Sequence, residues 1–82
     1  MGYTPEQFEK DITPFIPKKY FRTFTEQLSN TYIFSLMFNK GDEPEKWEIK
    51  ELEYIISDKF GMNILKSKID KAAYALRIYF TD

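Results

Sequence analysis

Apolar side chains recur at intervals of three and four along much of this chain, the spacing that places them on one face of an α-helix. Residues 18–39 contain neither glycine nor proline, and the recurring positions there are Phe21, Phe24, Leu28, Tyr32 and Leu36. A second set is Ile49, Leu52, Ile56 and Phe60, and a third is Leu65, Ile69, Ala72, Ala73, Leu76 and Phe80. The spacing therefore predicts three amphipathic helices after residue 17.

A further short helix is predicted over residues 5–12. Thr4 stands at the N-cap position and Pro5 at the first helical position, where its missing N–H is of no consequence. Gln7 completes the spacing of a capping box, and Tyr3 and Phe8 stand where a hydrophobic staple would place them. Together the segments predict an all-α fold, a small four-helix bundle in a single globular domain over residues 1–82, and the sequence shows no internal repeat.

Two of these segments also have the character of strands. Residues 31–38 are rich in Thr, Tyr, Ile and Phe, which favour strands, but they lack strict alternation, and this favours the helix. Residues 74–80 could form a strand at the C-terminal end. If the two segments were strands and paired, the fold would be α+β, and the sequence leaves this alternative open.

The composition removes most of the common catalytic chemistry. The chain has no Cys and no His, which excludes disulfides, thiolate nucleophiles, zinc–thiolate sites and the commonest general base. Three glycines do not form a phosphate-binding loop, and Asp42, Glu43 and Glu45 lack the spacing of a calcium loop and fit a helix start. We therefore expect a protein that is not an enzyme and that has no cofactor and no metal.

No stretch of the sequence approaches the twenty apolar residues that a membrane-spanning helix needs. The first residues also lack the basic and apolar regions of a signal peptide. These observations predict a cytoplasmic protein without membrane contact.

Charge is segregated along the chain, although the net charge is only −1. Residues 42–62 hold three basic and seven acidic side chains, whereas residues 63–82 hold four basic and two acidic ones. The two predicted helices over residues 45–80 have the spacing of a helix-turn-helix, the alternative function considered for this chain. Its cations would be Lys66, Lys68, Lys71 and Arg77. The acidic helix beside them disfavours duplex binding, so nucleic acid is not the partner we expect.

The segment from Tyr32 to Phe38 is apolar on all sides, more than one core-facing helix stripe requires. Its outer positions, together with aromatic residues off the main stripes, predict a partner-binding surface. The residues chosen for it are Ile33, Phe34, Met37, Phe38, Trp47 and Tyr54, and Tyr20, Tyr74 and Tyr79 could extend it. We expect a non-enzymatic protein-binding module that modulates another protein, or that binds a second copy of itself as a homodimer.

In size and in its content of Lys, Ile, Phe and Tyr, the chain is similar to small proteins of AT-rich bacteria and their phages. That class includes phage or mobile-element inhibitors of host machinery, such as anti-CRISPR proteins, and bacteriocin immunity proteins. The similarity implies an inhibitor as the first expectation and a bacteriocin-immunity-like protein as a second alternative. No motif in the sequence selects one of these classes.

Overall fold

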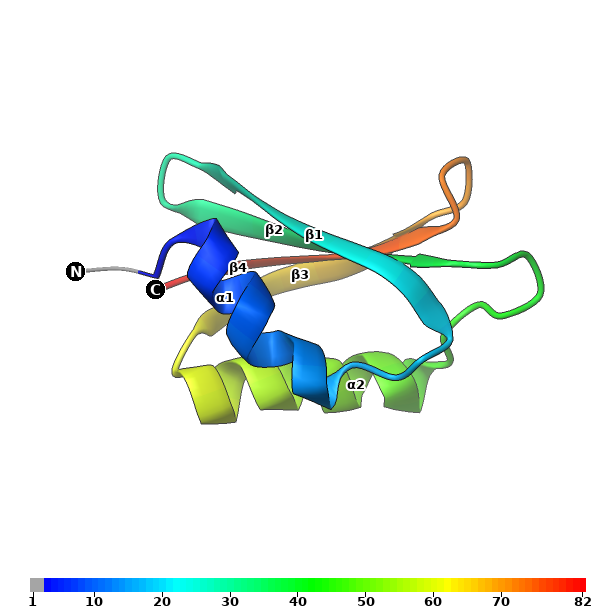
Figure 1. The fold of residues 1–82 in the computed structure, drawn as a ribbon, viewed down its shortest axis with the longest axis horizontal. Helices are drawn as coiled ribbons and strands as arrows, with labels where there is room; N and C mark the ends of the chain where they lie inside the picture. Colours follow the sequence, from blue (N-terminus) through cyan, green and yellow to red (C-terminus); the bar gives the residue numbers. More distant parts are fainter. Residues whose placement is uncertain (1–2) are drawn as a thin grey trace.

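Two helices pack on the same side of a four-stranded antiparallel sheet in the computed structural model, which describes residues 3–82 (Figure 1). The strands lie in the order β1-β2-β4-β3. Along the chain the elements are α1 (Pro5–Ile12), a 3₁₀ turn η1 (Thr13–Phe15), β1 (Tyr20–Leu28), β2 (Thr31–Phe38), α2 (Lys46–Tyr54), a π-helical extension η2 (Ile55–Lys59), β3 (Asn63–Asp70) and β4 (Ala75–Thr81).

The fold is thus α+β, and the prediction of an all-α four-helix bundle was wrong. The alternative describes it better: residues 31–38 form β2, and β2 pairs with β4, for example Phe34 with Ile78. Apolar and polar residues do not alternate strictly along β2 because this strand is central in the sheet, between β1 and β4. Its even-numbered side chains face the helices, and Ile33 and Met37 are still half-buried on the other face. A central strand can be apolar on both faces, and periodicity alone does not distinguish it from a buried helix.

The predicted last helix is a β-hairpin formed by β3 and β4. Its turn is stabilised by Asp70, whose Oδ1 accepts hydrogen bonds from the amides of Ala72 (3.1 Å) and Ala73 (3.2 Å). Tyr74 completes the turn with a positive φ of 50°. A local side-chain cap of this kind offers the backbone an alternative to the helix.

The two helices that exist are those with the clearest end signals. Gln7 N donates to Thr4 Oγ1 at 3.1 Å, as the N-cap prediction requires, although the Gln7 side chain donates to Asp11 and does not return to Thr4. Helix α2 begins after Glu45 and has a capping box, in which Glu45 N donates to Glu48 Oε1 at 2.7 Å. The helical segment ends before Gly61, whose φ is 67°.

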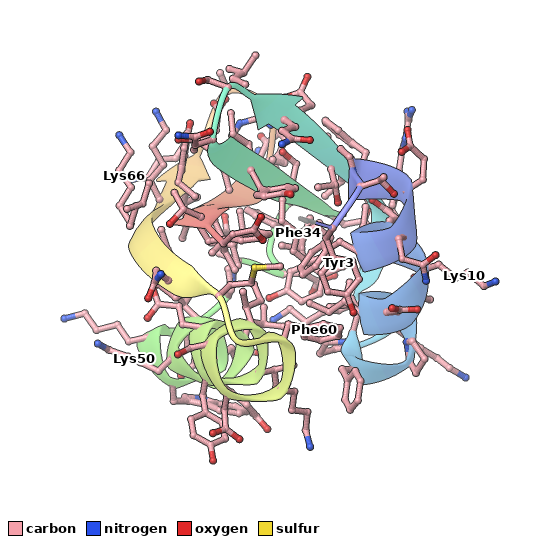
Figure 2. The ribbon with its side chains drawn as sticks, turned by 90° about the vertical axis from the view of Figure 1, so that its left-hand side faces the viewer. Tyr3, Lys10, Phe34, Lys50, Phe60 and Lys66 are labelled. Atoms are coloured by element: carbon pink, nitrogen blue, oxygen red, sulfur yellow. The ribbon has the colours of Figure 1, made fainter. Side chains whose placement is uncertain are left out.

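The core lies between the sheet and the two helices. Phe34 on β2 is fully buried, and Figure 2 shows it pointing toward Tyr3 and Phe60 between the layers. The Phe8 ring of α1 lies 5.4 Å from the Phe34 ring and 4.8 Å from the Phe80 ring, measured between centroids. Leu52 on α2 and Ile56 on η2 belong to the same cluster. Aromatic rings therefore provide much of the apolar contact in this small core.

The architecture repeats: each half of the chain is a helix followed by a β-hairpin. Glu9 Oε2 on α1 accepts a hydrogen bond from Thr23 Oγ1 on β1 at 2.5 Å. Glu53 and Ser67 each stand 44 residues later, and Glu53 Oε2 accepts from Ser67 Oγ at 2.6 Å. The sequence did not reveal this repeat because the equivalent positions share chemical character more often than identity.

Candidate functional site

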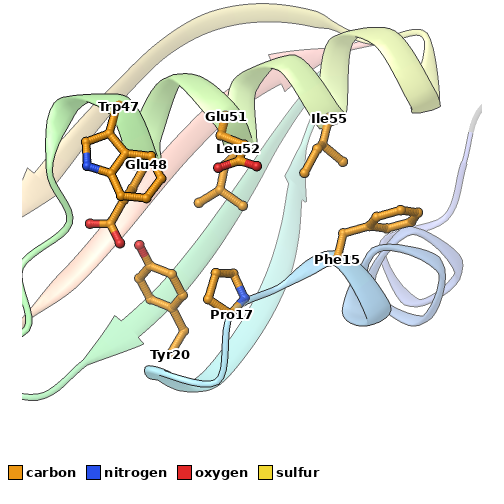
Figure 3. A pocket seen from close by; sticks show the side chains of 8 residues that line it. All are labelled: Phe15, Pro17, Tyr20, Trp47, Glu48, Glu51, Leu52 and Ile55. Atoms are coloured by element: carbon orange, nitrogen blue, oxygen red, sulfur yellow. The ribbon is translucent and has the colours of Figure 1, made fainter.

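A groove runs between α2 and the segment that leads from η1 into β1 (Figure 3). Its cavity volume is about 100 Å³. Its lining residues are Phe15, Pro17, Tyr20, Trp47, Glu48, Glu51, Leu52 and Ile55. The groove therefore joins two parts of the chain that are about thirty residues apart, which sequence periodicity cannot bring together.

Helix geometry places Trp47, Glu51 and Ile55 on the groove side of α2, because residues four apart lie one above the other. The capping box at Glu45 fixes the first turn, from which Trp47 projects with 61 % of its surface exposed. On the opposite wall the Phe15 ring packs edge-on against Phe60, with 6.2 Å between centroids, and remains partly exposed. Two aromatic rings therefore flank a floor that includes buried Leu52.

Tyr20 supplies the most unusual polar group of the groove. Only 6 % of Tyr20 is exposed, and its hydroxyl has no hydrogen-bond partner among the described residues. Figure 3 shows the hydroxyl pointing toward α2, beside the Glu48 carboxylate and below the Trp47 ring. Burial, with a smaller effect from the charge of Glu48, raises the pKa of Tyr20 to about 12. The hydroxyl is therefore a protonated donor at neutral pH, and residues 3–82 give it no acceptor.

Glu48 holds the two walls together. Lys19 Nζ lies 3.0 Å from Glu48 Oε1 and 2.9 Å from Oε2, and this ion pair links the segment before β1 to α2. The Glu45 amide, followed by Lys19, lowers the pKa of Glu48. Its carboxylate is thus ionised and engaged within the protein. Glu51, also at the groove, forms no ion pair within residues 3–82 and is exposed.

The residues predicted to bind a partner are divided between three places. Phe34 and Phe38 belong to the core, which corrects their assignment to an exposed helix surface. Ile33 and Met37 lie half-buried on the sheet face turned away from the helices. Trp47 and Tyr54 are exposed on α2 by 61 % and 63 %, and Trp47 borders the groove.

Sequence reasoning identified Trp47 and Tyr20 as residues off the main stripes, but it did not connect them. It missed Phe15 as part of a site altogether. The available signal was an aromatic residue between Pro14 and Pro17, two residues that restrict the backbone, and in the structure Phe15 ends the 3₁₀ turn η1 and is exposed.

The basic residues chosen for the alternative of a helix-turn-helix DNA-binding protein do not lie on a helix. The helix-turn-helix prediction is therefore wrong, because the second of its two helices does not exist. Lys66 and Lys68 are on β3, Arg77 is on β4, and Lys71 is in the turn between these strands. The register nevertheless places Lys66, Lys68 and Arg77 on one face of the sheet, because Lys68 pairs with Arg77 and Lys66 with Tyr79.

Two further features bear on chemistry. Within residues 3–82 no group of three acidic side chains is arranged to hold a metal ion. The same part of the chain has no helix that is long and apolar enough to cross a membrane.

No family model, curated protein or solved structure matches this chain. The function must therefore be argued from the geometry of the groove and of the sheet.

Proposed function

We propose that the protein binds an extended segment of another protein in the groove beside α2 and thereby modulates that partner. The observation that carries this proposal is the buried Tyr20 hydroxyl, which has no acceptor among the described residues and lies against α2 at the wall of the groove. Leaving a buried hydroxyl without a partner costs about 1–3 kcal/mol. A backbone carbonyl of a bound segment would accept this hydrogen bond and recover that free energy.

The apolar part of the groove suits a single anchoring side chain. Trp47 and Phe15 expose their rings on its two walls, and Leu52 and Ile55 provide aliphatic contacts between them. Tryptophan and tyrosine are enriched among the residues that dominate binding energy at protein interfaces. An aliphatic or aromatic side chain of the partner is therefore the expected occupant of the hollow.

Charge specifies the residues next to that anchor. Residues 42–62 carry seven acidic side chains against three basic ones, and Glu51 stands at the groove. Because Glu48 is already paired with Lys19, Glu51 is the carboxylate available to a ligand at this place. A Lys or Arg beside the apolar anchor would complement it and would increase the rate of association.

The proposed ligand is thus a peptide segment with an apolar anchor, an adjacent Lys or Arg and a free backbone carbonyl. Selection of random peptides displayed on phage against the immobilised full chain tests this description. We expect enriched peptides to share an apolar residue next to a basic one. Their binding should weaken at least tenfold in Trp47→Ala and in Glu51→Lys.

A matched control is available in Leu28, which is as exposed as Trp47 (64 %) but lies at the end of β1. Leu28→Ala should bind the selected peptides as the wild type does. Enrichment of no peptide, or equal weakening by Leu28→Ala and Trp47→Ala, would overturn the proposal.

The modulating role is a proposal of the same kind. The selected sequence motif identifies candidate partners, including the host proteins that a phage or mobile-element inhibitor would bind. We expect the activity of the true partner to fall on addition of the wild-type protein and to be unaffected by Trp47→Ala.

A further inference from the structure

The sheet has a second face, which turns away from both helices and which no helix covers within residues 3–82 (Figures 1 and 2). The strand register defines its rows. One row runs across all the strands as Phe24, Ser35, Arg77 and Lys68. The next row runs as Glu26, Ile33, Tyr79 and Lys66. The face therefore combines aromatic, apolar and basic side chains with one exposed carboxylate, that of Glu26.

Each aromatic ring of these rows has a cation over its face. The Arg22 guanidinium carbon lies 5.7 Å from the centroid of the Phe24 ring. Lys66 Nζ lies 4.8 Å from the centroid of the Tyr79 ring. Both rings are half-buried, so one part of each is fixed by the sheet and another part remains accessible. Such rings are rigid platforms, and a flat group can stack on them when the flexible Arg22 and Lys66 side chains swing outward from the ring faces.

Positive charge is in excess on this face. Arg22, Lys66 and Lys68 form no ion pair with any carboxylate in residues 3–82, whereas Arg77 is paired with Asp70 at 3.3 Å. The face thus opposes in sign the acidic α2 segment on the other side of the molecule. A ligand that combines negative charge with flat rings would complement it.

We propose that this uncovered sheet face binds single-stranded nucleic acid. Bases stack on Phe24 and Tyr79, and phosphates contact Arg22, Lys66 and Lys68. Single-stranded nucleic acid has both requirements, because its phosphates are regularly spaced and the faces of its bases are free. In a duplex those faces are stacked on one another and are not available to Phe24 and Tyr79. A four-stranded sheet has room for two or three bases. This inference rests on a different surface from the peptide groove.

Fluorescence anisotropy of the full chain with labelled oligothymidylate and oligouridylate tests the proposal. We expect binding that weakens steeply between about 50 and 200 mM salt, with a logarithmic slope near −2 if three phosphates are neutralised. The variant Lys66→Glu/Lys68→Glu should lose at least tenfold in affinity. Tyr79→Ala should lose about 5- to 150-fold, the range that one stacked base contributes.

The matched control is Lys10→Glu/Lys50→Glu, which changes the net charge by the same amount. Lys10 is on α1 and Lys50 is on α2, the two helices that pack on the other face of the sheet, and Figure 2 shows Lys10 on the opposite side of the molecule from Lys66. We expect this control to retain most of the affinity. Thermal melts establish that each variant folds. Lys68→Glu alone, at an exposed position, replaces the double variant if the latter unfolds and should lose several-fold in affinity.

Three results would overturn the proposal. They are no binding of either oligonucleotide by the wild type, equal loss of affinity in the control and the Lys66/Lys68 variants, and duplex affinity as high as single-strand affinity. None of these results bears on the peptide groove, because Trp47 and Tyr20 lie outside this face.

Discussion

Arg77 Nη1 donates a hydrogen bond to Ser35 Oγ at 2.7 Å across the two central strands, β2 and β4. Ser35 is fully buried, and Arg77 also reaches Asp70, with Nη2 3.3 Å from Oδ2. Ser35 belongs to the first helix–hairpin unit, and Arg77 and Asp70 belong to the second. One polar contact therefore links the two units within the sheet and also supports the β3–β4 turn.

Replacement of Arg77 by Leu should destabilise the protein by about 1–3 kcal/mol, because it leaves the Ser35 hydroxyl buried without a partner. In the double variant Ser35→Ala/Arg77→Leu that hydroxyl is gone, and the total loss should be smaller than the sum of the single losses. Urea denaturation of the four proteins measures this coupling. Additive losses would show that the hydrogen bond contributes nothing to stability.

The two equivalent glutamates should differ in their effect on stability. Glu9 accepts hydrogen bonds from Thr23 at 2.5 Å and from Thr25 at 2.8 Å, whereas Glu53 accepts one, from Ser67. Glu9→Ala should therefore lower the free energy of unfolding by about 1–3 kcal/mol and Glu53→Ala by less. Glu6→Ala, at an exposed position of α1, serves as the control for helix propensity and should change little. Denaturant midpoints in the opposite order would contradict the assigned contacts.

Acid should destabilise the protein partly through Glu48. Its pKa is lowered in the folded state, so over the acid range the unfolded chain binds its proton first. The stability that the ionised Glu48 contributes is fully present above its ordinary pKa of 4.5, and it is lost as the pH falls through the lowered pKa of the folded state. Between about pH 5 and pH 2, Glu48→Gln should lose less stability than the wild type. Asp70, whose pKa is also lowered, acts in the same direction in both proteins. Parallel curves of melting temperature against pH would refute the role given to Glu48.

Tyr20→Phe should stabilise the free protein, because it removes a buried hydroxyl that has no acceptor. The increase in the free energy of unfolding should be on the order of 1 kcal/mol. The variant should also resist alkali better. The folded pKa of Tyr20, about 12, lies above its ordinary value of 10, so the wild type loses stability as the pH rises through this interval. A destabilised variant would mean that the hydroxyl has an acceptor in the folded chain.

Local end signals predicted the two helices that exist, whereas apolar periodicity predicted two further helices where the structure has β-hairpins. The Thr4 cap and Gly61 are signals that act within a few residues, and both operate in the structure. The strands depend on distant pairing: Phe34 and Phe38 looked like surplus apolar positions because nothing in the sequence shows that β2 is a central strand. The spacing of four between Tyr32 and Leu36 suits a helix, but a strand places the same two residues on one face as well.

The site was predictable only in part for the same reason. Trp47 and Tyr54 stood out because they lie off the core-facing side of α2, and they are exposed there. The Tyr20 hydroxyl lacks a partner because of how the start of β1 packs against α2. Trp47, the α2 residue at this place, stands 27 residues after Tyr20 in the sequence. A contact of that sequence separation leaves no periodic trace in the chain.

The most direct test of the proposed function is a ¹H–¹⁵N NMR titration of the full chain with a peptide selected by display. We predict shift changes concentrated at the two groove walls, in residues 15–20 and 47–55, with the Trp47 indole N–H among the strongly shifted signals. The amides of β3 and β4 should remain in place. Shift changes confined to the outer sheet face, or spread evenly over the chain, would contradict the assignment of the groove as the peptide-binding site.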